Sequence, residues 1–117
     1  MIVIAFIAAA GLGGVLRLLA ESYWPPVGVS AFPRATLIVN CVGSFMLGIV
    51  LNAPHDLRLV VGTALCGALT TLSGVSLQLY RRVSSGGIVP ASIYLGSTLG
   101  AGGLCAFIGI QLGQRIF

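Results

Sequence analysis

The sequence predicts an all-α membrane protein with four transmembrane helices, and three observations support this fold class. Of the 117 residues, 57% are hydrophobic and only 7% are charged, against roughly 25% in a typical soluble domain. The mean hydropathy is +1.09, too apolar for a surface that faces water. Four apolar segments follow one another, at about 2–19, 35–51, 59–79 and 88–112, each close to the about 20 residues that a helix needs to cross a bilayer. The length suits a single domain over 1–117.

The first segment is interrupted only by Arg17, near its end. Because no clear cleavage site follows and three more apolar segments come after it, we expect a retained helix rather than a signal peptide. Arg17 has two readings: its charge reaches the membrane interface along a flexible stem, or it attracts an anion into a vestibule.

The second segment carries a carboxamide, Asn40, with Gly43 and Ser44 about one helical turn later. An amide in hydrocarbon is costly unless its donors and acceptor find partners. Asn40 therefore either joins helices together or contacts something that passes along them.

Polar side chains crowd the third segment between residues 66 and 78. They are Thr70, Thr71, Ser73, Ser76 and Gln78. These hydroxyls can simply bond back to their own helix. Alternatively, the helix is broken near 67–71, which is tolerated at membrane depth only where the backbone is buried in protein or lines water. Carbonyls freed by such a break can coordinate a small hard cation.

The fourth segment contains Tyr94 and Thr98, which share one helix face because they are four residues apart. They serve either packing or a path of hydroxyl donors.

The chain also holds 17 glycines, many of them inside the segments. Small residues let helices approach closely in lipid, so we expect tight packing and oligomerisation, with any pore at a subunit boundary.

The number and placement of the charged residues limit the classes of function that the chain can have. The six arginines are scattered and flank the apolar segments, as interfacial anchors do, so we expect no nucleic-acid partner. The Arg81–Arg82 pair falls in the connection after the third segment. Four arginines fall on the side of the first and third connections, and two on the side of the chain ends. A difference this small is compatible with insertion in both orientations. No Asp or Glu lies within a segment and no nucleophile–base pair is visible, so an enzyme is not expected, and a donor-lined path with basic ends favours an anion.

Three motifs resemble those of the Fluc (CrcB) family of fluoride channels. The stretch "ATLIVNCVGSFMLG" at 35–48 resembles the family's G-T-L-x-x-N-x-x-G-S-F-x-x-G. The stretch "CGALTTLSGVSLQ" at 66–78 resembles C-G-G-L-T-T-F-S-T-F-S-x-E, and "GLGGVLR" at 11–17 resembles G-x-G-x-x-x-R. The resemblance covers nearly the whole chain.

The resemblance implies an antiparallel, dual-topology dimer in the plasma membrane of a prokaryote, multi-pass, with two pores along the subunit interface through which fluoride leaves the cell. By motif position, the implied pore residues are Asn40, Thr71, Ser73, Thr98 and the vestibule residue Arg17. The resemblance also implies a structural sodium ion (Na+) at the dimer centre, held by backbone carbonyls of Gly67 and Thr70.

The chain departs from the family pattern at the two phenylalanines whose ring edges face the ion. Leu72 and Val75 stand there instead. A ring edge is electropositive and can contact an anion, whereas Leu and Val offer neither that edge nor a donor. Losing such contacts could raise the barrier by several kcal/mol, each ~1.4 kcal/mol being tenfold in rate. The chain is then either one half of a heterodimer with a paralogue that supplies the phenylalanines, which we favour, or a homodimer that conducts differently or little.

Two alternatives come from other classes. A small multidrug-resistance exporter for cations also has four short helices, but it needs a carboxylate within its first helix, and the first carboxylate here is Glu21, beyond that segment. A non-conducting structural partner subunit is the other alternative.

Overall fold

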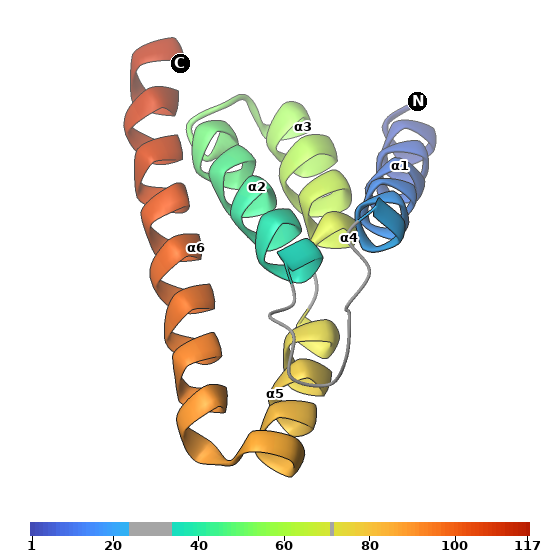
Figure 1. Cartoon of the computed structure of the whole chain (residues 1–117). Helices are drawn as coiled ribbons and strands as arrows, with labels where there is room; N and C mark the ends of the chain where they lie inside the picture. The colour runs from blue at the N-terminus through green and yellow to red at the C-terminus, as the bar shows by residue number, and fades with distance from the viewer. Residues whose placement is uncertain (24–33, 71) are drawn as a thin grey trace.

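The computed structural model describes residues 1–23, 34–70 and 72–117, and the side chains of all of these except 73 and 85. Every element in the described part is a helix (Figure 1). The elements are α1 (Ile2–Tyr23), α2 (Arg34–Val50), α3 (His55–Leu57), the π-helix η1 (Arg58–Cys66), α4 (Gly67–Leu69), α5 (Leu72–Gly86) and α6 (Ile88–Ile116). The molecule measures 46 × 28 × 19 Å, and both chain ends lie at the same end of it (Figure 1). The predicted all-α class is confirmed for the described residues.

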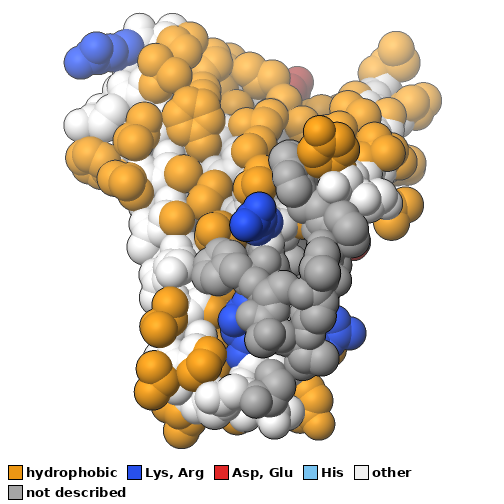
Figure 2. All heavy atoms as spheres, in the orientation of Figure 1, with side chains coloured by type: hydrophobic (Ala, Val, Ile, Leu, Met, Phe, Trp, Pro, Cys, Tyr) orange, Lys and Arg blue, Asp and Glu red, His pale blue; other side chains and the backbone are white. Residues whose placement is uncertain are grey.

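Three helical stretches are long and apolar enough to cross a membrane: Ile2–Tyr23, His55–Ser84 and Ile88–Ile116. The fourth apolar helix, α2, is shorter, with 17 residues. Hydrophobic side chains cover much of the face seen in Figure 2, with few charged ones among them. Such a surface would be unstable in water and suits lipid. The chain is thus a multi-pass membrane protein, and the count of four spans stays a prediction.

The third apolar stretch is interrupted near its middle. Its first part consists of α3, η1 and α4, and ends at Leu69. Thr70 is extended, with φ −76° and ψ 157°, and α5 begins at Leu72. The Cys66 carbonyl accepts two hydrogen bonds from Thr70, one from its amide and one from its hydroxyl, both at 2.9 Å. The extended backbone of Thr70 ends this helix and confirms the predicted break as far as the described residues reach. The Thr70 hydroxyl also bonds back to its own helix, as the other alternative expected.

Glycines mark the closest helix contacts. A Cβ placed on Gly109 or Gly113 of α6 would collide with backbone of α2, and one placed on Gly48 of α2 would collide with backbone of α6. A Cβ on Gly13 of α1 would likewise meet Leu65 of η1. Backbones at this separation gain dispersion contacts that a larger residue would prevent. The tight packing expected from the glycine content is confirmed at these positions.

The hairpin of α5 and α6 turns on a single residue, Gly87. Its φ of +87° and ψ of −169° are a combination that only glycine adopts readily. α5 therefore stays helical up to Gly86 and lies beside the first part of α6 (Figure 1). The Arg81–Arg82 pair, expected in a connection, is helical instead, because the one-residue turn leaves no room for a loop.

Candidate functional site

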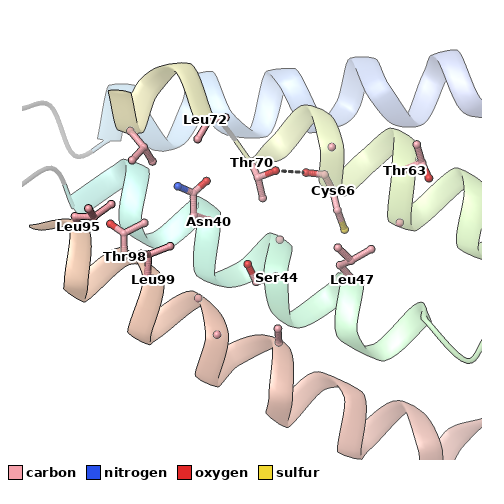
Figure 3. A pocket seen from close by; sticks show the side chains of 17 residues that line it. Asn40, Ser44, Leu47, Thr63, Cys66, Thr70, Leu72, Leu95, Thr98 and Leu99 are labelled. Atoms are coloured by element: carbon pink, nitrogen blue, oxygen red, sulfur yellow. Dashed lines mark hydrogen bonds between the residues drawn. The ribbon is translucent and has the colours of Figure 1, made fainter. Parts of the chain in front are cut away.

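A cleft of about 780 Å³ opens between α2, the broken third stretch and α6 (Figure 3). Its shape follows from the fold: α2 and α6 touch at their glycines, and the break at Thr70 separates α5 from the preceding helix. The lining residues are Asn40, Gly43, Ser44, Leu47, Gly62, Thr63, Cys66, Gly67, Thr70, Leu72, Val75, Leu95, Thr98, Leu99, Gly102, Gly103 and Ala106.

The lining combines apolar walls with a few polar side chains. Leu95 and Leu99 of α6 contribute to the apolar wall. Asn40 projects from α2, Thr70 from the end of α4 and Thr98 from α6 into the same part of the cleft (Figure 3). The Thr98 hydroxyl oxygen is buried. The Thr70 hydroxyl donates its proton to the Cys66 carbonyl, and the Thr98 hydroxyl lies in hydrogen-bond contact with Tyr94. Amide and hydroxyl groups of this kind can donate to an anion.

The structure brings together four of the seven residues expected at the site. Asn40, Gly67, Thr70 and Thr98 all line the cleft. Arg17 lies half-buried on α1 and is not among the lining residues.

Two further expected residues lie wholly or partly outside the described part. Thr71 lies outside the described residues, and Ser73 belongs to α5 but its side chain lies outside the described part. The roles expected of all seven residues stay predictions.

One polar lining residue, Thr63 of η1, was not expected from the sequence. Thr63 lies seven residues before Thr70, and residues seven apart share a helix face. That spacing was the available signal, although the π-helical winding of η1 changes the period there.

The chain resembles a known protein family over residues 4–110, and the family is described as "CrcB-like protein, Camphor Resistance (CrcB)". That match covers far more than half of the chain. The chain belongs to this family.

Individual relatives of this CrcB-family chain carry a more specific name. The "Fluoride-specific ion channel FluC" of a Roseiflexus species is 34% identical over 116 residues, which cover 93% of this chain and 94% of the relative. The protein of the same name from Agrobacterium fabrum is 33% identical over 125 residues and 100% of both chains. The "Fluoride-specific ion channel FluC 2" of Bacillus cereus is 32% identical over 116 residues, 97% of this chain and 98% of the relative. The family suggested by the three motifs is thereby confirmed.

Both positions at which this CrcB-family chain lacks the expected phenylalanine border the cleft. Leu72 is 80% exposed and stands at the start of α5. Val75 is 7% exposed and packed inside the subunit. The two departures thus change the cleft wall itself, one at an exposed position and one at a buried position.

The end of α4 suits a small hard cation held by backbone oxygens. Thr70 leaves the helical conformation, and the last carbonyls of a helix generally lack amide partners within it. No heavy atom lies within 4 Å of the position of a Cβ on Gly67, which leaves space beside that backbone. Among the described residues, no three His, Cys, Asp or Glu side chains gather to hold a metal ion. A cation here would depend on oxygen ligands such as backbone carbonyls, and the sodium site expected at Gly67 and Thr70 stays a prediction.

Proposed function

We propose that this chain is a subunit of a fluoride channel, through which fluoride leaves the cytoplasm passively across the plasma membrane. The observation that carries the proposal is the cleft: side chains from three separate elements present amide and hydroxyl groups to one apolar space within the membrane-spanning part. The full-length similarity to relatives named fluoride-specific ion channels supports the choice of anion.

The chemistry of the lining favours an anion over a cation. Among the described residues that line the cleft, none carries a carboxylate. Glu21, expected beyond the first helix, lies inside it, because α1 extends to Tyr23. It is exposed in the last turn and does not line the cleft, so it is not placed as a cation exporter would need it. Fluoride gives up bound water when it enters a narrow path, and donors such as Asn40 and Thr98 replace part of that hydration.

A second subunit would complete the path. The cleft is partly open, with Leu72 exposed at its edge, so its wall is incomplete within one subunit. We propose that an inverted homologous subunit covers it, giving an antiparallel dimer with a path along the interface.

We propose a paralogue, rather than an identical copy, as that partner. A homodimer would place Leu72 and Val75 in both paths, without any electropositive ring edge. The numeral in the name "FluC 2" of the Bacillus cereus relative is consistent with the presence of more than one such chain in an organism. A sodium ion at the dimer centre, bound by the carbonyls of Gly67 and Thr70, completes the proposal.

Fluoride efflux from liposomes tests the proposed function. The chain is purified alone and after co-expression with a fluoride-channel paralogue from the same genome, and a fluoride electrode records release after valinomycin allows potassium to balance the charge. We expect rapid release with the co-expressed pair and slow release with the chain alone. Efflux by the chain alone at the rate of the pair would exclude the heterodimer, and no release above empty liposomes from either sample would exclude the channel.

A further inference from the structure

Arg82 is a cation enclosed within the α5–α6 hairpin. The residue is only 7% exposed, and its Nε atom is buried. The guanidinium carbon lies 5.6 Å from the centre of the Tyr94 ring, which is itself fully buried. The neighbouring Arg81 is exposed. A cation over an aromatic face is held there by the negative face of the ring, and an ionisable side chain enclosed in a membrane-spanning stretch marks function.

Two helices place this cation in line with the cleft. On α5, Arg82 lies seven residues after Val75, so both occupy one helix face, and Val75 lines the cleft. On α6, Tyr94 lies one turn before Thr98, which also lines the cleft. The guanidinium therefore lies beyond the end of the cleft that these two lining residues define.

We propose that Arg82, positioned by Tyr94, supplies the positive potential that draws fluoride to this end of the cleft. A charge surrounded by protein and lipid acts over a longer distance than one in water, because less solvent screens it. This potential would offset part of what the chain lacks at Leu72 and Val75. The inference rests on the proposed function, since it concerns the same anion path.

Three variants separate the charge from the bulk of the side chain. Arg82→Met keeps an apolar stem without the charge, Arg82→Lys keeps the charge, and Arg81→Met removes an exposed charge one residue away as the matched control. Initial efflux rates from liposomes are measured over a range of fluoride concentrations, with the channel assembled as for the wild type. We expect Arg82→Met to raise the half-saturating fluoride concentration roughly three- to tenfold with little change in the limiting rate. Arg82→Lys and Arg81→Met should stay within about twofold of the wild type.

Tyr94 provides a second test that leaves the charge present. Tyr94→Phe keeps the ring that holds Arg82 but removes the hydroxyl that contacts Thr98, so the half-saturating concentration should stay that of the wild type even where the limiting rate changes. Tyr94→Leu removes the ring that holds Arg82 and should shift the half-saturating concentration in the direction of Arg82→Met, with the double variant no worse than Arg82→Met. If Arg82→Met does not fold, Tyr94→Leu decides in its place.

The outcomes are distinguishable from a purely structural role and from failure of the proposed function. An unchanged half-saturating concentration in both Arg82→Met and Tyr94→Leu would overturn the inference. So would equal losses of limiting rate in Arg82→Met and Arg82→Lys, which would indicate packing rather than charge. Absence of efflux from the wild-type assembly would instead reject the channel itself, and the inference with it.

Discussion

Replacing Gly109 with alanine should weaken the close packing of α2 against α6. A Cβ at this position would overlap the Phe45 carbonyl oxygen and would lie 3.1 Å from the carbon of that carbonyl and 3.2 Å from the Cα of Gly48. All three atoms belong to the backbone of α2, so none can turn aside as the end of a side chain could. The two helices would therefore have to move apart where they contact each other.

The expected magnitude follows from two opposing effects. Overpacking of this kind costs about 1–3 kcal/mol, and the better helix propensity of alanine returns up to about 1 kcal/mol. We therefore expect Gly109→Ala to lower the free energy of unfolding by about 1–2 kcal/mol, which is roughly a five- to thirtyfold change in the folded-to-unfolded ratio.

The matched control is Gly100→Ala on the same helix, where no heavy atom lies within 4 Å of the added Cβ. It should leave stability unchanged or raise it by up to about 1 kcal/mol. Unfolding is followed by circular dichroism in mixed micelles as the fraction of dodecyl sulfate rises. Equal midpoints for Gly109→Ala and Gly100→Ala would refute the backbone-contact reasoning.

Four further outcomes are expected. Asn40→Ala should lower fluoride efflux by the assembled channel about tenfold or more, and an unchanged rate would favour a structural subunit. Leu72→Phe should fold normally because the site is exposed, and it should raise efflux by the chain alone. Val75→Phe should instead lower the free energy of unfolding by about 1–3 kcal/mol because the buried site would be overpacked. Equal stability of the two variants would contradict this. Thr70→Val should lower stability by about 1 kcal/mol through loss of the hydroxyl bond to Cys66, with Thr70→Ser as the control that keeps it. Exchanging sodium for N-methylglucamine should lower the melting temperature of the assembly, and indifference to the cation would count against the sodium site.

The break in the third stretch could be predicted because its cause is local. Hydroxyl residues that compete for backbone carbonyls cluster at 70–73, and Thr70 does bond the Cys66 carbonyl one turn earlier. Asn40 and Thr98 could be singled out in the same way, since polar groups inside apolar segments need a reason.

Features that depend on how helices meet could not be predicted. The sequence indicated that Arg82 was one of two interfacial arginines, whereas its burial and its contact with the Tyr94 ring follow from the packing of α5 against α6. Thr63 enters the cleft from η1, and its spacing of seven residues from Thr70 was only a weak signal because a π-helix changes the period. The opposite exposures of Leu72 and Val75 likewise follow from the way α5 packs after the break.

The length of α6 ties the protein to the thickness of its membrane. With 29 residues at 1.5 Å each, the helix is about 44 Å long, well beyond a hydrocarbon layer of ~30 Å. It must lean or extend into the headgroups. The same helix contributes to the glycine contacts with α2, to the cleft wall and to the hairpin with α5. A thinner or thicker bilayer that changed the tilt of α6 would therefore alter all three at once, so we expect ion flow to depend on lipid chain length.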